Sequence, residues 1–232
     1  PYTRACPMPQ ALLGIFLTAF GQNPQAKQTI PTRFRDRIMT EDEVLSEFRA
    51  SSALLEGHFL LSSGRHSAHY LQCARVLMNP DRAGRLAMAL AANLPRDLKH
   101  QIEKVVSPAM GGIIFGHEMG RALGKDAIFL ERPEGTFELR RGFTIEPGEK
   151  VLMVEDVVTT GLSSREAIAA VETAGGEVIA MASLVDRSGG SVEFPVPYYS
   201  LVTISFPTYA ENEVPAALAA LPATKPGSRA KP

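Results

Sequence analysis

VLMVEDVVTTGLS, residues 151–163, is the stretch that decides the fold of this chain. Its first four residues are apolar and predict a buried strand over residues 151–154. Two adjacent acids, Glu155 and Asp156, follow the strand, and a loop of small residues follows the acids. Two like charges side by side resist burial, and an ordinary turn between a strand and a helix needs neither of them. The acid pair therefore indicates a binding site at the end of the strand.

A helix is expected over residues 164–174, directly after the loop. Ser163 and Glu166 have the S-x-x-E spacing of a capping box, so Ser163 is the predicted N-cap. Gly161 lets the loop backbone take φ > 0 or approach a ligand closely. Free N–H groups, hydroxyls and a helix N-terminus suit the phosphate of a phosphorylated sugar, and the acids can accept hydrogen bonds from its hydroxyls. The alternative interpretation is an ordinary β–α turn that binds nothing.

The composition is that of a globular protein and excludes several classes of partner. A formal net charge of −1 gives no electrostatic case for binding nucleic acid or a membrane. No apolar run reaches the ~20 residues that a membrane helix needs. Cys6 and Cys73 have neither metal-ligand nor redox spacing, which predicts a reducing, cytoplasmic environment. The spacing of four histidines also predicts no metal site: His58, His66, His69 and His117.

The chain is expected to hold one α/β domain, because strands alternate with helices from Thr40 onward. This alternation predicts a doubly wound, mostly parallel sheet. The first helix is expected to begin at the capping box of Thr40 and Glu43 and to stop at Gly57. The predicted domain covers residues 39–210, between a leader or extension (residues 1–38) and a polar carboxyl-terminal tail (residues 211–232).

Ligands bind at the carboxyl ends of the strands in such a sheet, so four loops are expected to converge there. The loop after Ser107 contains Gly111 and Gly112, which suit an anion such as pyrophosphate or, equally, tight packing of a helix on a strand. The loop after Glu131 is expected to be exposed, and it carries three arginines: Arg132, Arg140 and Arg141. As a lid they would stabilise charge on a leaving group, and a solvated hairpin is the alternative.

The fourth loop follows a strand predicted to end at Val185. Arg187 in this loop can bind a carboxylate of a ligand, in two parallel hydrogen bonds if the geometry allows. The alternative is an internal ion pair between Arg187 and Asp186 at the strand end.

These motifs together resemble the type I phosphoribosyltransferases, and within them the orotate branch. Residues 151–163 are similar to the family's phosphoribosyl-pyrophosphate signature. Residues 60–67 resemble the amino-terminal hood of the orotate branch, residues 106–112 its pyrophosphate loop, and residues 185–190 the segment with its orotate-binding arginine. The resemblance covers roughly residues 40 to 210, and it implies a small hood and a flexible loop over the site.

The resemblance implies that orotate and phosphoribosyl pyrophosphate react, with Mg²⁺, to orotidine monophosphate and pyrophosphate. Glu155 and Asp156 would hold the ribose hydroxyls, Gly111 and Gly112 would bind pyrophosphate, and Thr159 and Arg187 would contact orotate. Residues around the 5-phosphate would be Val157, Val158, Thr159, Thr160, Gly161, Leu162 and Ser163. Arg132, Arg140 and Arg141 would act from the mobile loop. Mg²⁺ would be held mainly by substrate oxygens, so no protein ligand set is predicted. In the family the mobile loop reaches the neighbouring subunit's site, which implies a homodimer.

Two features depart from the pattern of the orotate branch. Many relatives have a lysine where this chain has Ser62 and another where it has Gly111. Many also carry Lys and His in the mobile loop, where this chain has three arginines and neither Lys nor His. Two other functions remain open on the sequence. A purine or other base phosphoribosyltransferase would not need Arg187 for a carboxylate. A non-catalytic regulator that binds phosphoribosyl pyrophosphate would usually carry a basic nucleic-acid-binding surface, which a net charge of −1 does not favour.

Overall fold

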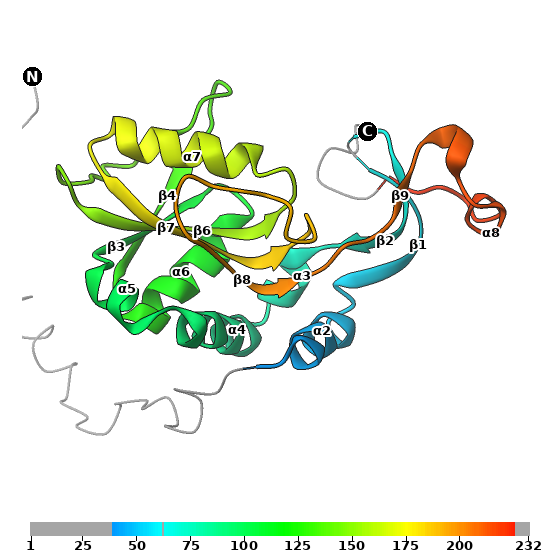
Figure 1. Ribbon diagram of the computed structural model, residues 1–232, viewed down its shortest axis with the longest axis horizontal. Coiled ribbons are helices and arrows are strands. Elements are labelled where there is room, and N and C mark those ends of the chain that lie inside the picture. The colour runs from blue at the N-terminus through cyan, green and yellow to red at the C-terminus, as the bar shows by residue number, and fades with distance from the viewer. Residues whose placement is uncertain (1–38, 62, 226–232) are drawn as a thin grey trace, which may run out of the picture. The chain divides into compact units, whose positions relative to one another are not determined.

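The computed structural model describes residues 39–61 and 63–225 (Figure 1). The predicted leader, residues 1–38, lies outside the described residues, as do Ser62 and the last seven residues of the predicted tail, 226–232. None of the helices in the described ranges is long and apolar enough to cross a membrane.

A six-stranded sheet forms the centre of the fold, in the order β5-β4-β3-β6-β7-β8. The neighbours from β4 to β8 are parallel, and only the short β5 runs antiparallel to its neighbour β4. The bounds of the strands are β3 Lys104–Pro108, β4 Asp126–Glu131, β5 Glu138–Leu139, β6 Lys150–Val158, β7 Glu177–Asp186 and β8 Tyr198–Thr203. The prediction of a doubly wound, mostly parallel sheet is confirmed.

Helices cover both faces of this sheet, which explains why its central strands are almost continuously apolar. On one face lie α4 (Pro80–Asn93) and α6 (Gly112–Leu123), and on the other lies α7 (Leu162–Thr173) (Figure 1). Side chains of β6 alternate between the faces: Leu152 packs in the cluster with α4 and α6, and Met153 packs in the cluster with α7. The core therefore consists of two layers that hold β6 between them.

The amino-terminal part begins with the predicted capping box. Thr40 N donates to Glu43 Oε2 at 2.9 Å, Glu43 N donates to Thr40 Oγ1 at 3.3 Å, and α2 (Glu41–Ala50) follows. The prediction that this helix continues to Gly57 was wrong. The Ser51 hydroxyl bonds the last carbonyls of α2, and Gly57 lies within strand β1. The reason is a non-local pairing that a helical spacing of apolar residues does not reveal.

This pairing builds a second, three-stranded sheet in the order β1-β2-β9, the hood of the molecule. Its strands are β1 Leu54–Leu60, β2 His66–Leu71 and β9 Thr208–Tyr209. Four short elements have too few residues for a periodic pattern and were not predicted: α3 Cys73–Leu77, α5 Arg96–Gln101, the 3-10 helix η3 Glu211–Glu213 and α8 Ala216–Ala219.

The described part of the predicted tail is attached to the hood. Thr224 N donates to the His58 carbonyl at 2.9 Å, and Leu60 N donates to the Thr224 carbonyl at 2.8 Å. The buried His58 ring bonds the Leu221 carbonyl through Nδ1 at 3.0 Å and His66 Nδ1 through Nε2 at 2.7 Å. These contacts explain His58 and His66 as packing residues.

Candidate active site

The four predicted loops meet at the carboxyl ends of the parallel strands. From β3 the chain crosses through α6 to β4, and from β6 it crosses through α7 to β7 on the other side. Since β3 and β6 are neighbours, the two connections leave in opposite directions and open a crevice between their loops, the usual ligand site of such sheets. The glycine loop after β3 and the acid pair of β6 lie at this crevice.

The acid pair lies within a strand and not in the loop after it. β6 continues to Val158, and its pairing with β7 extends to Val158 opposite Asp186. The prediction that the strand ends at residue 154 was therefore too short, because the apolar residues 157 and 158 were assigned to the loop. Val158 is 1% exposed and packs in the core, so its side chain does not face a ligand, and its carbonyl accepts a hydrogen bond from Arg187 N at 2.8 Å. Glu155 and Asp156 gain a rigid position from this extension.

The electrostatics of the acid pair differ from those of a surface carboxylate. Burial raises the pKa of Glu155 well above its ordinary value, and the neighbouring Asp156 charge raises it further. The charge of Arg132 and a hydrogen bond from the Ser163 side chain offset part of this pKa shift. Burial also raises the pKa of Asp156. Hydroxyl donors or a positive charge arriving in the crevice would stabilise both carboxylates.

The loop at residues 159–161, here called the phosphate loop, leads into α7 earlier than predicted. Gly161 is the N-cap, with φ +70°, and the first amide of the helix, Leu162 N, donates to Thr160 Oγ1 at 3.4 Å. The prediction of Ser163 as N-cap was wrong. Gly161 takes a left-handed conformation that starts the helix at Leu162, and the Ser163 side chain bonds Glu155 instead. Beyond Leu162, the first-turn N–H groups of Ser163 and Ser164 have no acceptor among the described residues and are available to an anion. Thr159 and Thr160 are exposed beside them.

The two glycines of the predicted pyrophosphate loop have different roles. A Cβ at Gly111 would lie 2.8 Å from Asp156 Oδ1, so this glycine lies directly against the acid pair. A Cβ at Gly112 would lie 3.3 Å from Ser107 Cβ and 3.3 Å from the Val154 carbonyl oxygen, which is the packing demand of a helix on its strand. The packing interpretation therefore applies to Gly112, and anion binding at Gly111 stays a prediction. A side chain at position 111 would meet Asp156 in this arrangement.

The loop with three arginines is anchored at its middle. Phe137 is 6% exposed and packs in the core beneath α7, and β5 pairs with β4 directly after it. Arg132 forms an ion pair with Glu166 of α7, and its guanidinium carbon lies 4.0 Å from the centre of the Phe137 ring. Its charge also acts on Glu155. Of the three arginines, Arg132 is the one that the structure connects to the acid pair.

Arg140 and Arg141 lie on the outer side of the same hairpin and bind Glu131. The distances to the Glu131 carboxylate are 3.9 Å from Arg140 Nη1 and 2.6 Å from Arg141 Nε. Both side chains are at least half exposed. Nothing in the described contacts joins them to the acid pair, so their part in catalysis stays a prediction.

Arg187 is available for a ligand. The Asp186 carboxylate accepts hydrogen bonds from Ser188 N at 2.7 Å and Gly190 N at 3.2 Å, which orders the loop after β7. Arg187 has no ion pair with any carboxylate in the described part of the chain, so the alternative of an internal Arg187–Asp186 pair does not hold. Burial lowers the pKa of Arg187 somewhat, which marks a cation that has lost water without gaining a counter-charge.

Two residues near Arg187 were not found from the sequence. Tyr70 of β2 and Cys73 of α3 both interact electrostatically with Arg187. Cys73 Sγ also lies 3.9 Å from the Asp156 carbonyl oxygen, and burial raises the pKa of its thiol well above the ordinary value, so the thiol is neutral. Tyr70 lies near the end of a hood strand and Cys73 begins the helix after it. The only signal in the sequence was the aromatic side chain of Tyr70 near the end of that strand. The hood therefore closes the Arg187 side of the crevice.

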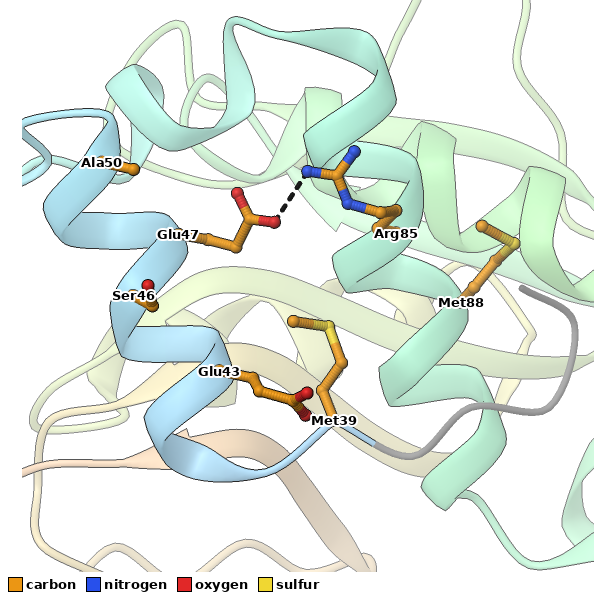
Figure 2. Close-up of a pocket in the computed structure, with 7 residues that line it drawn as sticks. All are labelled: Met39, Glu43, Ser46, Glu47, Ala50, Arg85 and Met88. Atoms are coloured by element: carbon orange, nitrogen blue, oxygen red, sulfur yellow. Dashed lines mark hydrogen bonds and ion pairs between the residues drawn. The ribbon is translucent and has the colours of Figure 1, made fainter. Parts of the chain in front are cut away.

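A cavity elsewhere on the molecule has no residue in common with these loops. It measures about 410 Å³, lies between α2 and α4, and is lined by Met39, Glu43, Ser46, Glu47, Ala50, Arg85 and Met88 (Figure 2). Glu47 bonds Arg82 at 2.9 Å and Arg85 at 2.7 Å across the two helices. These ion pairs explain Glu47 and Arg85 as residues that hold α2 against α4.

The fold defines the class of this protein: an α/β domain with a mostly parallel sheet whose switch point is the usual ligand site of such sheets. The sequence-family model of the phosphoribosyl transferase domain matches residues 79–219 of this chain, which is more than half of it. The orotate phosphoribosyltransferase of Novosphingobium aromaticivorans is 76% identical over 194 residues, which cover 84% of this chain and 100% of that protein. The orotate phosphoribosyltransferase of Erythrobacter litoralis is 76% identical over 193 residues, 83% of this chain and 100% of that protein.

A solved structure agrees with these sequence relatives. The crystal structure of orotate phosphoribosyltransferase from Aeropyrum pernix matches with a TM-score of 0.56 and 27% identity, over 69% of this chain and 93% of that one. The chain therefore belongs to the orotate phosphoribosyltransferase family of the phosphoribosyl transferases. The resemblance proposed from the sequence is confirmed.

Proposed function

We propose that this protein transfers the phosphoribosyl group of phosphoribosyl pyrophosphate to orotate, which gives orotidine 5'-monophosphate and pyrophosphate for UMP biosynthesis. The observation that carries this proposal is Arg187, a partly buried guanidinium beside the phosphate loop that has no carboxylate partner among the described residues. Orotate is a base with a carboxylate, which a planar guanidinium can bind through two hydrogen bonds. The names of the most similar relatives support the same base.

The residues of the crevice divide the work of this reaction. The phosphate loop and the N-terminus of α7 bind the 5-phosphate, and Glu155 and Asp156 bind the ribose hydroxyls. A base nitrogen forms a bond to the anomeric carbon as the bond from that carbon to pyrophosphate breaks, so positive charge develops on the ribosyl centre. The two buried carboxylates stabilise this charge, and Arg132 and the loop at Gly111 stabilise the negative charge on the leaving pyrophosphate.

We also propose Mg²⁺ as the cofactor, because the carboxylate oxygens of Glu155 and Asp156 suit this hard cation. Among the described residues no group of three or more His, Cys, Asp or Glu side chains is placed to hold a metal ion. The remaining oxygen ligands would thus come from the pyrophosphate and ribose of the substrate and from water. When bound, the ion neutralises negative charge on the leaving pyrophosphate.

The working form that we propose is a cytoplasmic homodimer. Cys73 is a free, buried thiol, in keeping with a reducing environment. Arg140 and Arg141 are exposed on the outer side of their hairpin, where a second copy could receive them. Mixing an inactive Asp156→Asn protein with an inactive protein that carries both Arg140→Ala and Arg141→Ala tests this point. Recovered activity in the mixture is expected if the arginines act across subunits, and no recovery would contradict it.

One experiment separates orotate from the other candidate substrates. The protein is incubated with Mg²⁺, phosphoribosyl pyrophosphate and one base at a time (orotate, adenine, hypoxanthine or uracil), and consumption of the base is followed. Turnover of orotate alone is expected. Turnover of a purine but not of orotate would contradict the proposal, and binding of phosphoribosyl pyrophosphate without turnover of any base would favour a regulator.

A further inference from the structure

One side chain of α7 holds the phosphate loop from behind. Arg165 Nη2 donates to the Thr160 carbonyl oxygen at 2.6 Å, and Arg165 Nη1 donates to the Glu193 carbonyl oxygen at 3.0 Å. The guanidinium carbon lies 5.8 Å from the centre of the Phe194 ring. Glu193 and Phe194 belong to the segment between Arg187 and β8. A single guanidinium thus joins the phosphate loop to the loop on the orotate side.

The bond to Thr160 determines the direction of a backbone amide. In a trans peptide the C=O and N–H groups of one peptide unit point in opposite directions. Since Arg165 holds the Thr160 carbonyl on its own side, the N–H of Gly161 is directed to the other side. No acceptor in the described part of the chain bonds this N–H, although Gly161 is buried. A buried donor without a partner indicates a ligand.

The packing around Gly161 supports the same direction. A Cβ at Gly161 would lie 3.0 Å from Arg165 Nη1, 2.7 Å from Val192 Cγ1 and 3.2 Å from Phe194 Cε1. That side of the loop is therefore filled by Arg165 and by the segment after β7. A phosphate can reach the loop only from the opposite side, where the N-terminus of α7 also opens.

We propose that Arg165 is a positioning residue that holds the Thr160–Gly161 peptide with its N–H toward the 5-phosphate and ties this loop to the segment after Arg187. Arg165 acts through the backbone and does not touch the substrate. The inference rests on the proposed function for the identity of the complete substrate. The phosphate geometry itself requires only a phosphorylated pentose.

Two substitutions separate positioning from simple attraction by charge. Arg165→Lys keeps the positive charge, but one ammonium group cannot replace a planar fork that bonds two separate carbonyls. Arg165→Ala removes both charge and fork. Arg96→Ala serves as the matched control, because it removes an arginine at the start of α5, outside the four loops.

The first measurement is calorimetric titration of each variant with ribose 5-phosphate, together with its melting temperature. Affinity is expected to fall about tenfold in both Arg165 variants, because the Gly161 N–H is no longer held toward the charged phosphate that it would bond, and to stay unchanged in Arg96→Ala. Wild-type affinity in Arg165→Lys would mean that charge alone matters and would overturn the proposal. Unchanged affinity in Arg165→Ala would overturn it as well.

The second measurement uses the wild-type protein and does not depend on how a variant folds. Thr160-Gly161 is the only Thr-Gly dipeptide in the sequence, so labelling threonine carbonyls with ¹³C and glycine amides with ¹⁵N gives one correlated signal. Ribose 5-phosphate should move the Gly161 amide proton downfield. A bound ligand that leaves this signal in place would refute the proposal. Since ribose 5-phosphate lacks base and pyrophosphate, a protein that does not act on orotate would still give a decisive result here.

Discussion

Replacing Arg187 with alanine tests the assignment of the base most directly. In the ligand-free protein the Arg187 guanidinium is partly buried near Tyr70 and Cys73, and no described carboxylate balances its charge. Orotate would supply that carboxylate, whereas phosphoribosyl pyrophosphate is held by the phosphate loop and the acid pair. The substitution should therefore affect the two substrates unequally.

The size of the effect follows from the contacts that are lost. A hydrogen bond to a charged group contributes about 1.5–3 kcal/mol, and about 1.4 kcal/mol corresponds to a factor of ten. The KM for orotate should thus rise roughly 10- to 100-fold, while the KM for phosphoribosyl pyrophosphate changes less than about threefold. Because burial without a counter-charge lowers the pKa of Arg187, its removal should not lower the melting temperature.

Initial rates with each substrate varied in turn provide the assay, and orotate consumption can be followed by ultraviolet absorbance. Arg187→Lys keeps a charge but loses the planar fork, so its KM for orotate should lie between those of the wild type and Arg187→Ala. An equal rise of both KM values, or a large fall in melting temperature, would show that Arg187 holds the loop after β7 and does not bind the base.

Three further substitutions test the acid pair, the glycine loop and the arginine hairpin. Burial and Asp156 raise the pKa of Glu155 above its ordinary 4.5, so its ionised form destabilises the fold once the pH exceeds that value. Glu155→Gln should therefore raise the melting temperature at neutral pH, and this gain should vanish below about pH 4.5. Thermal unfolding of both proteins across this pH range checks the prediction, and a gain that does not depend on pH would contradict it. Gly111→Ala places a Cβ 2.8 Å from Asp156 Oδ1 and should raise the KM for phosphoribosyl pyrophosphate by about tenfold or more; an unchanged KM would show that the loop yields freely. Phe137→Ala empties a core site and should lower the free energy of unfolding by about 3–5 kcal/mol in urea titrations, and kcat should fall as Arg132 loses its support; Phe137→Leu is the milder control, and equal stability of both variants would refute the anchoring role.

The sequence was sufficient for the features that depend on local order. Apolar runs gave the central strands, and the Thr40 capping box is present as predicted. The acid pair and the glycines were correctly predicted to lie together at the carboxyl ends of the strands, because these ends meet on one side of a parallel sheet. Local patterns carry this much because periodicity and capping act over a few residues.

Features that depend on distant partners were missed. β6 continues past Asp156 because residues 157 and 158 pair with β7, and the first helix ends early because β1 pairs with β2. Local composition also left open whether Arg187 pairs with Asp186 or is free for a ligand; in the structure the Asp186 carboxylate accepts hydrogen bonds from the Ser188 and Gly190 backbone instead. Cys73 and Tyr70 reach the site from another sheet and the helix after it, which no spacing along the chain encodes.

The burial of the acid pair connects the fold to the chemistry. Two adjacent carboxylates with reduced access to water destabilise the strand that holds them. The raised pKa values of Glu155 and Asp156 show the direction of this effect. Arg132 and Ser163 compensate only part of it for Glu155. Ribose hydroxyls would compensate more, and positive charge on the ribosyl centre the most, since that charge appears only as pyrophosphate leaves. The carboxylates would then stabilise the transition state more than the bound substrate, which is the condition for an interaction to accelerate the chemical step.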